Sequence, residues 1–301
     1  MRILLLGQHG QLSRELQLSL HGAGQLLVAG RDRLDLAEPA QIRRQLRALR
    51  PELIVNAAAY TAVDQAEHEP QPAFALNATA PGILAEEAAA LAVPLIHYSS
   101  DYVFDGRQST PYDEDDAPNP LNVYGQSKLA GERAIQAVGG AHLILRSSWI
   151  YSLHGRNFLL SMQRLLRERD ELKVVDDQIG APTWAGSLAS ATGELIERWR
   201  SGRAGPWGLY HLCAQGETSW FGFASAIAEH LRAHGPVRRP PAADPQQRLS
   251  DPGPAPAQLA PGLFAPATRL AGPAAGLARR PARLPAQPTL RAPGCIMRPI
   301  A

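Results

Sequence analysis

Short apolar runs alternate with stretches of helical periodicity through the first 150 residues, and this alternation constrains the fold more than any other feature. Each run is apolar almost throughout, which is typical of strands that helices cover on both faces. Strands separated by helices predict parallel pairing through crossover connections. We therefore expect an α/β fold with a Rossmann-like doubly wound parallel sheet. The predicted strands lie at 2–6, 25–30, 52–59, 94–100 and 142–149.

Two segments between these strands have contrasting compositions. Residues 70–92 are dense in alanine, which predicts one helix that packs closely on the sheet. Residues 109–122 are instead rich in proline, aspartate and asparagine, which indicates a loop. This loop leads to a helix that is predicted to start near Val123.

The pattern becomes looser after residue 156, which predicts sheet additions and a smaller lobe at 157–235. The expected elements are a helix at 157–169, a strand at 172–178, a helix at 187–200, a strand at 208–213 and a helix from about Ser219. Thr218 precedes the last of these helices and is predicted to cap it.

The composition changes abruptly near residue 235. Residues 236–301 hold more than half of the chain's prolines, with nine basic and only two acidic residues. Such a segment cannot bury enough apolar surface to offset the entropy lost on ordering. We expect a disordered tail rich in Pro, Ala and Arg, with a basic binding tail as the alternative.

Charge and cysteine content exclude several classes of protein. Residues 1–235 carry 21 basic and 26 acidic residues, although the whole chain has a net charge of +2. A body of that sign has no extended basic face, which argues against nucleic acid as a partner. Cys213 and Cys295 are too few for a disulfide framework or a zinc site, which indicates a reduced, cytoplasmic setting. No run approaches the roughly 18 apolar residues of a membrane span.

A glycine-rich turn follows the first predicted strand. Gly7, Gly10 and Ser13 form the pattern GxxGxxS between a strand that ends at Leu6 and a helix that begins near Gln11. This arrangement directs backbone N–H groups and the positive end of a helix toward a pyrophosphate, as in dinucleotide-binding folds. A tight turn that needs small residues only for packing is the alternative.

The residues after the second predicted strand bear on the choice of dinucleotide. A site selective for NAD would place an acidic residue about twenty residues past Gly10, but the chain has Gly30 and Arg31 there. Arg31 could pair with a 2′-phosphate, which favours NADPH, while the neighbouring Asp32 keeps NADH open. The other residues expected to line the cofactor site are Asp35, Leu36, Ala58, Ala59 and Tyr60.

Tyr124 and Lys128 stand four residues apart in LNVYGQSK, so their side chains share one face of the predicted helix. An ammonium group beside a phenol can lower the phenol's pKa. We therefore predict that Tyr124 is a proton donor near pH 7.

Polar residues end the fourth predicted strand, at the edge where open parallel sheets hold ligands. Ser99, Ser100 and Asp101 emerge there, and we expect Ser100 and Asp101 to contact a substrate, because a hydroxyl there can bond both a carbonyl and the phenol that protonates it. The alternative is that these serines only satisfy backbone groups at the strand end. Trp149 could pack on a sugar or a base, or lie in the core. His97 is interpreted as a core histidine whose hydrogen bonds are satisfied.

Several motifs in residues 1 to about 232 resemble the extended short-chain dehydrogenase/reductase superfamily and, within it, the dTDP-4-dehydrorhamnose reductase family. These motifs are GQHGQLSRELQ, IVNAAAYTAVDQAE, HYSSDYVFDG, PLNVYGQSKLAGE, RSSWIY, DDQIGAPT and GLYHL. The resemblance implies that Tyr124 is the proton donor and that Lys128 holds the nicotinamide ribose and lowers the phenol's pKa. It also implies that Ser100 tunes the proton transfer and that Trp149 contacts the deoxysugar nucleotide.

The same resemblance implies an NADP-binding domain at 1–156, in which Gly10, Gln11 and Leu12 line the cofactor phosphates, and a substrate lobe at 157–235. The implied reaction delivers a hydride from NAD(P)H to C4 of a 4-keto-6-deoxy-L-hexose carried on dTDP. Related dehydratases use an acidic pair after the strand-four hydroxyl, whereas Asp101 is followed here by Tyr102. Two alternatives are a non-catalytic NADP-binding regulatory subunit and an inactive, truncated reductase.

The C-terminus departs from the family, which normally closes with an RPxNS-like stretch, a Leu-Asp motif and a final helix that bears a tryptophan. One hypothesis is that the reading frame shifted near residue 235. The magnesium-linked homodimer that the family implies is therefore in doubt for this chain, and no metal site is predicted within it.

Overall fold

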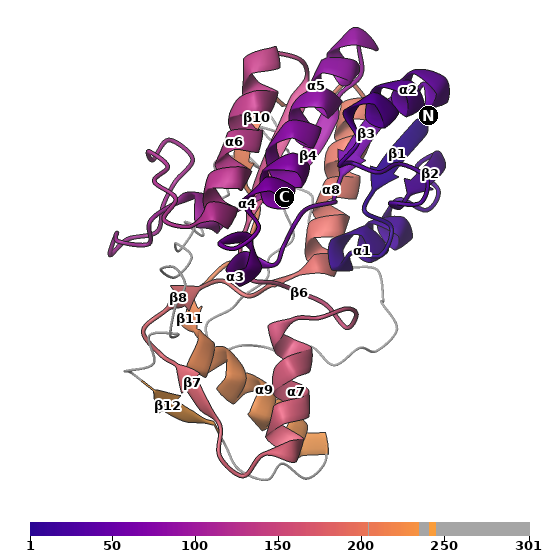
Figure 1. Cartoon of the computed structure of the whole chain (residues 1–301). Helices are drawn as coiled ribbons and strands as arrows, with labels where there is room; N and C mark the ends of the chain where they lie inside the picture. Colours follow the sequence, from indigo (N-terminus) through magenta and orange to yellow (C-terminus); the bar gives the residue numbers. More distant parts are fainter. Residues whose placement is uncertain (204, 235–240, 245–301) are drawn as a thin grey trace.

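A six-stranded parallel sheet forms the body of the molecule in the computed structural model, which describes residues 1–203, 205–234 and 241–244 (Figure 1). The strand order is β10-β5-β4-β3-β1-β2. The strands are β1 (Arg2–Leu6), β2 (Gln25–Ala29), β3 (Leu53–Asn56), β4 (Leu95–Ser100), β5 (His142–Ser147) and β10 (Gly208–His211). The predicted doubly wound α/β sheet is therefore confirmed, and all five strands predicted before residue 150 are present.

Helices cover both faces of this sheet (Figure 1). In β1, Ile3 and Leu5 point into one apolar core while Leu4 and Leu6 point into the other, because successive side chains of a strand alternate between faces. The first core includes α1 (Gln11–Ser19) and α8 (Ala185–Arg200), and the second includes α2 (Pro39–Leu49), α5 (Ala80–Ala90) and α6 (Val123–Val138). Two covered faces explain why each strand is apolar throughout.

The order of the strands reverses on either side of β1. Leu6, the last residue of β1, pairs with Ala29 of β2 on one side and with Asn56 of β3 on the other. The chain therefore leaves the carboxyl ends of β1 and β3 in different directions. Such a switch point opens a crevice at the carboxyl edge of the sheet, where α/β proteins bind ligands.

The single helix predicted at 70–92 is divided in the structure. A π-helical turn, η1 (Ala75–Thr79), separates α4 (Pro70–Phe74) from α5. Within this turn the buried Asn77 bonds both the N–H (2.9 Å) and the C=O (3.0 Å) of Tyr60, and it donates to the Ser127 hydroxyl of α6 (3.0 Å). These tertiary bonds hold the turn open, so periodicity alone could not predict it.

Helix α6 starts at Val123, as predicted, after a loop. The Asn122 side chain caps it by accepting a hydrogen bond from the Gly125 N–H (2.7 Å). A side chain at Gly125 would collide with the Tyr102 carbonyl oxygen, so glycine lets the first turn of α6 approach the chain after β4. The short helices α3 (Val63–Ala66) and η2 (Asp101–Val103) lie beside this turn.

A smaller lobe lies below the sheet in Figure 1. It contains α7 (Phe158–Glu168), β7 (Lys173–Val175), α9 (Trp220–His234) and β12 (Ala242–Asp244), and its apolar cluster includes Leu159, Leu166, Phe223 and Ile227. Strand β12 pairs with β7 in this lobe. Two further pairs, each made of two-residue strands, complete the lobe and its junction with the body: β6 (Ile150–Tyr151) with β9 (Thr183–Trp184), and β8 (Ile179–Gly180) with β11 (Thr218–Ser219).

The Ser219 hydroxyl accepts the Gly222 N–H (3.0 Å) at the start of α9. Ser219 directly precedes the first residue of this helix, so it takes the capping position predicted for Thr218, one residue earlier. Strand β12 lies past residue 235, and the predicted domain boundaries stay predictions. The tail predicted at 236–301 lies outside the described residues, apart from 241–244.

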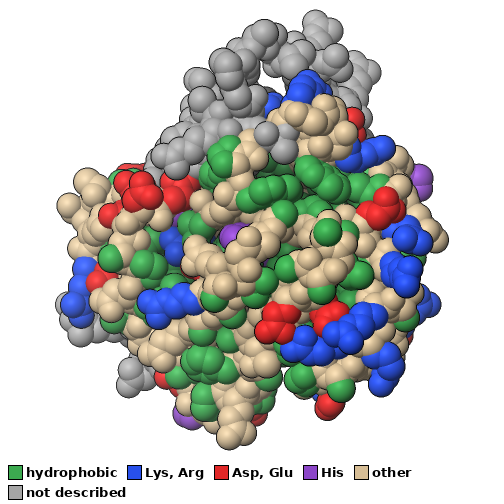
Figure 2. All heavy atoms as spheres, turned by 90° about the horizontal axis from the view of Figure 1, so that it is seen from above, with side chains coloured by type: hydrophobic (Ala, Val, Ile, Leu, Met, Phe, Trp, Pro, Cys, Tyr) green, Lys and Arg blue, Asp and Glu red, His purple; other side chains and the backbone are tan. Residues whose placement is uncertain are grey.

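Acidic and basic side chains are interspersed on the described part of the face seen from above in Figure 2. No described helix is both long enough and apolar enough to cross a membrane.

Candidate active site

An open cleft of about 860 Å³ lies at the carboxyl edge of the sheet, and it is lined from the ends of β1, β2, β3 and β4 and from α6. All residues predicted to bind the cofactor line it. They are Gly7, Gly10, Gln11, Leu12, Gly30, Arg31, Asp35, Leu36, Ala58, Ala59, Tyr60, Tyr124 and Lys128. The predicted substrate residues Ser100, Asp101 and Trp149 are not among those that line it.

The turn after β1 needs glycine at its first position. Gly7 has a φ of +99°, and a β-carbon there would lie 2.9 Å from the Ala57 carbonyl oxygen, so the ends of β1 and β3 approach too closely for a side chain. Gly10 occupies the N-cap position of α1, where it has no side chain to bond the first N–H groups. These groups and the positive end of α1 can therefore receive an anion.

The end of β2 forms another crowded corner of the cleft. A β-carbon at Gly30 would lie 2.6 Å from Gln8 Oε1 and 2.8 Å from Asp32 Oδ1. The exposed Arg31 donates from Nε to Asp35 Oδ2 (3.0 Å). The pKa of Asp35 is lowered, first by the hydrogen bond from the Ala37 N–H and then by Arg31. Arg31 thus already has a carboxylate partner at this corner.

Gln11 lines the cleft, but its side chain is hydrogen-bonded to the loop that precedes α7. Its Oε1 accepts from Asn157 Nδ2 (2.6 Å) and from the Ser152 hydroxyl (3.1 Å). Its Nε2 donates to the Arg156 carbonyl oxygen (3.5 Å). The side chain therefore holds the 152–157 loop beside the glycine-rich turn.

Tyr124 lies in the first turn of α6, with 8% of its surface exposed, and its ring meets that of Tyr102 edge-on at 5.3 Å between centroids. Burial raises the pKa of Tyr124 to about 12, whereas a hydrogen bond with Ser100 lowers it and the charge of Asp101 raises it. The pKa is therefore above its ordinary value in this structure, which differs from the lowering predicted from Lys128.

Lys128 is 2% exposed, and its Nζ donates to the carbonyl oxygen of Tyr98 (2.7 Å) on β4. Burial lowers the pKa of Lys128 to about 8, and Glu132, one turn along α6, acts in the opposite direction. His97 lies 3.5 Å from Lys128 through its Nε2. It is buried in β4 with hydrogen-bond partners, which agrees with the core histidine predicted.

Ser100 and Asp101 are both buried where β4 ends. The Ser100 hydroxyl donates to Asp101 Oδ1 (2.8 Å) and accepts the Tyr102 N–H (3.2 Å). Burial raises the pKa of Asp101 to about 7, which the Ser100 bond opposes. The structure therefore brings Ser100 to Tyr124, with a partly neutral carboxyl group behind it.

Trp149 lies between β5 and β6 and does not line the cleft itself. Its ring stacks on Trp220 of α9 with 3.4 Å between centroids and 5° between planes. Its φ of +44° is unusual for a bulky residue, and its buried indole N–H has no hydrogen-bond partner among the described residues. Strain and an unpaired donor often occur at binding sites.

Sequence reasoning missed several residues of the cleft. Asn56 lines it from the end of β3, two residues before the predicted Ala58, whereas Ser99, which was expected at the ligand edge of β4, lines it as predicted. Gly155 and Arg156 also line it, although they come from the loop that Gln11 holds. Asn56 lies inside a predicted strand, at the edge where ligands bind, so the strand pattern could have indicated it. No local pattern points to Arg156.

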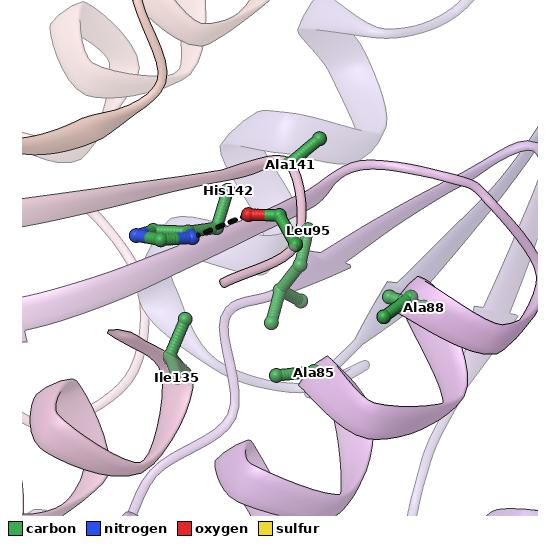
Figure 3. A pocket seen from close by; sticks show the side chains of 8 residues that line it. Ala85, Ala88, Leu95, Ile135, Ala141 and His142 are labelled. Atoms are coloured by element: carbon green, nitrogen blue, oxygen red, sulfur yellow. Dashed lines mark hydrogen bonds between the residues drawn. The ribbon is translucent and has the colours of Figure 1, made fainter. Parts of the chain in front are cut away.

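A second cavity is not part of this site. It lies between α5, α6 and the first residues of β4 and β5, where His142 Nδ1 bonds the Gly140 carbonyl oxygen at 2.7 Å (Figure 3). Its volume of about 10 Å³ holds one water molecule at most.

The family model for the RmlD substrate binding domain matches residues 1–260. A dTDP-4-dehydrorhamnose reductase of Burkholderia thailandensis is 45% identical over 236 residues, covering 77% of this chain and 79% of that protein. One from Escherichia coli K12 is 46% identical over 239 residues, covering 78% and 80%.

Solved structures agree with this result. A dTDP-4-dehydrorhamnose reductase from Bacillus anthracis in complex with NADP has a TM-score of 0.78 and 32% identity, covering 85% of this chain and 88% of that one. An orthologue from Clostridium acetobutylicum has a TM-score of 0.82 and 31% identity, covering 89% and 93%. The chain therefore belongs to the RmlD substrate binding domain family, with dTDP-4-dehydrorhamnose reductases among its relatives.

Proposed function

We propose that this protein is an NADPH-dependent reductase that converts dTDP-4-dehydro-6-deoxy-L-mannose (4-dehydrorhamnose) to dTDP-L-rhamnose, for cell-surface polysaccharide. The observation that carries the proposal is the cleft, whose lining combines the glycine-rich turn with Tyr124 and Lys128. The relatives named as dTDP-4-dehydrorhamnose reductases support the choice of substrate.

The residues of the cleft fit a dinucleotide. Gly7 and Gly10 leave the backbone N–H groups and the start of α1 open to a pyrophosphate. Arg31 is an exposed cation at the end of β2, with no acidic residue in the position that would repel a 2′-phosphate. NADPH is therefore the expected cofactor, and the NADP complex of a relative supports it. When bound, a reduced nicotinamide supplies a hydride to the substrate carbon.

The chain's own residues supply the proton and the surroundings of the reaction. Tyr124 is the proton donor to the C4 oxygen of the substrate, because its hydroxyl lies beside Ser100 at the edge of the cleft. Lys128 lines the same cleft one turn along α6, where it can bond a sugar hydroxyl and stabilise the phenolate left by proton transfer. Ser100 orients the phenol and the carbonyl group.

Trp149, at the junction with the lobe, is assigned to the substrate, together with Ser100 and Asp101 where β4 ends. Trp149 presents a buried indole N–H and a ring stacked on Trp220, which suit a nucleotide base or a deoxysugar. Asp101 is followed by Tyr102 rather than by a second acidic residue. Loss of water therefore lacks an acid and base pair, and reduction is favoured over dehydration.

A non-catalytic NADP-binding subunit and an inactive reductase are the competing functions. A binding subunit has no physical need for a buried phenol, serine and lysine at one edge of a cleft. The described residues hold no cluster of three acidic, histidine or cysteine side chains that could bind a metal ion.

The test is an assay of purified full-length protein with the 4-keto sugar nucleotide and either NADPH or NADH, with and without Mg²⁺. Loss of absorbance at 340 nm, faster with NADPH and accompanied by dTDP-L-rhamnose, is the expected result. Unchanged absorbance despite NADPH binding would contradict the proposal and favour the competing functions.

A further inference from the structure

A buried hydrogen-bond network leads from the end of β3 through His97 of β4 to Lys128 of α6. The Ala58 N–H donates to Asn56 Oδ1 (3.2 Å), and Asn56 Nδ2 lies 3.0 Å from His97 Nδ1. His97 Nε2 then lies 3.5 Å from Lys128 Nζ. Asn56 and His97 are each 1% exposed, and Lys128 is 2% exposed. The roles proposed for Tyr124, Lys128 and Ser100 do not involve Asn56 or His97.

The hydrogen-bond network fixes which nitrogen of His97 carries a proton. Because Asn56 Oδ1 accepts the Ala58 N–H, its amide nitrogen faces His97 and donates to Nδ1. Burial, and then the charge of Lys128, lower the pKa of His97 well below its ordinary value, so the ring is neutral. A neutral ring that accepts at Nδ1 carries its proton at Nε2. His97 therefore directs an N–H toward Lys128.

That N–H affects the two forms of Lys128 differently. An ammonium group has three donors and no lone pair, so it cannot accept the His97 N–H. An uncharged amine has a lone pair that can accept it, while still donating to the Tyr98 carbonyl oxygen. The contact therefore favours the amine, in the same direction as burial.

We propose that Asn56 and His97 are positioning residues for Lys128: Asn56 selects the His97 tautomer, and His97 holds Lys128 in a state that can lose its proton readily. The tautomer of His97 and the proton of Lys128 do not depend on the proposed function. Only the use made of that proton rests on it. A lysine that gains and loses a proton near neutral pH can restore the proton of Tyr124 after each turnover.

The other ionisable groups near Lys128 do not reproduce this effect. On α6, Glu132 favours the ammonium form, but Arg146 of β5 engages both of its oxygens (2.9 and 2.7 Å). Tyr124 on the same helix and Asp101 on η2 would also favour a cation when they are charged.

The remaining elements that pack on α6 contribute little near Lys128. Residues 75–79 of η1 include no ionisable side chain. On α5, Glu86 and Glu87 pair with arginines of α2. On α3, Glu67 accepts the Val123 N–H (2.7 Å) and Asp64 acts on Tyr102. His97 is thus the group that faces Nζ with a donor.

The chain has only two lysines, Lys128 and Lys173, which makes a direct measurement feasible. Lysine labelled with ¹³C at Cε gives one signal from each, and the exposed Lys173 serves as an internal reference. In the protein without cofactor or substrate, we expect Lys128 to titrate at least about one pH unit below the ordinary value of a lysine. In protein labelled with ¹⁵N-histidine, we expect His97 to be protonated at Nε2.

Two variants test the cause. His97→Gln offers an amide oxygen that can accept from the ammonium group, and Asn56→Asp provides a carboxylate that moves the ring proton to Nδ1. Both variants are expected to raise the pH at which Lys128 titrates by about one unit. They should also move the alkaline limb of the pH profile of kcat to higher pH. His142→Gln, at the opposite end of the sheet, is the matched control and should change neither.

A His97 ring protonated at Nδ1 in the unaltered protein would overturn the proposal. So would a Lys128 signal that titrates at the ordinary value of a lysine, or a titration of Lys128 that His97→Gln leaves unchanged. If a variant does not fold, the tautomer and the titration in the unaltered protein decide alone. None of these signals depends on turnover, so failure of the proposed function is recognised separately, in the 340 nm assay.

Discussion

The sheet and the lobe differ in how they are stabilised and in what they bring to the site. The sheet has an apolar core on each face, and its carboxyl edge carries nearly all of the cleft. The lobe has one smaller core between α7, α9 and β7. The lobe meets the sheet region through the stack of Trp149 on Trp220 and, on the loop before α7, through the bonds of Gln11. Cofactor binding and chemistry should therefore depend on the sheet, and substrate recognition on the lobe.

The largest effect should come from Tyr124→Phe, on the sheet side. The variant removes the transferable proton and leaves the cleft intact, so kcat should fall by about 10²- to 10⁴-fold with NADPH affinity nearly unchanged. Steady-state rates and a fluorescence titration with NADPH measure both quantities. Substantial activity in this variant would remove Tyr124 from the assigned role.

A pair of core variants tests whether the two regions respond independently. Leu166 in the lobe and Leu46 in the sheet region are both buried, at 1% and 0% exposure. Each change to alanine should cost about 2–5 kcal/mol of local stability. Leu166→Ala should leave NADPH affinity in place in a titration at moderate urea, whereas Leu46→Ala should weaken it. Equal loss of NADPH binding in both variants would show that the lobe and the sheet unfold together.

Trp220→Leu removes the ring that supports Trp149. Because stacked aromatic pairs contribute about 0.5–1.5 kcal/mol beyond their burial, KM for the sugar nucleotide should rise about three- to tenfold, with KM for NADPH unchanged. Trp207→Leu, at an exposed tryptophan outside the stack, is the matched control. A rise in the KM for NADPH would place the stack on the cofactor side instead.

Arg31→Ala should have the smallest effect, since Arg31 is exposed and already paired with Asp35. Its loss should raise KM for NADPH about twofold and leave KM for NADH unchanged, because only NADPH carries the 2′-phosphate. An equal change for both cofactors would mean that Arg31 does not select between them.

The sequence was sufficient for features that depend on local pattern. The apolar runs predict β1 to β5 because both faces of the sheet are covered, and the glycine-rich turn marks the end of β1. Spacing alone placed Tyr124 and Lys128 on one helix, and both line the cleft.

Features that depend on distant contacts could not be predicted in this way. The π-turn at Asn77 exists because Tyr60 and Ser127 bond its side chain from other elements. Arg156 reaches the cleft through the bonds of Gln11 to a loop that is 145 residues away in sequence. The pKa of Tyr124 is set mainly by burial, which helix spacing does not contain.

A crystal structure of the complex with NADP⁺ and dTDP-L-rhamnose is the decisive measurement of how this site works. We expect the dinucleotide to lie along the carboxyl edges of β1 and β3, with the Tyr124 hydroxyl within hydrogen-bond reach of the sugar O4 and Lys128 on the nicotinamide ribose. A dinucleotide bound elsewhere, or a Tyr124 hydroxyl directed away from the sugar, would contradict this expectation.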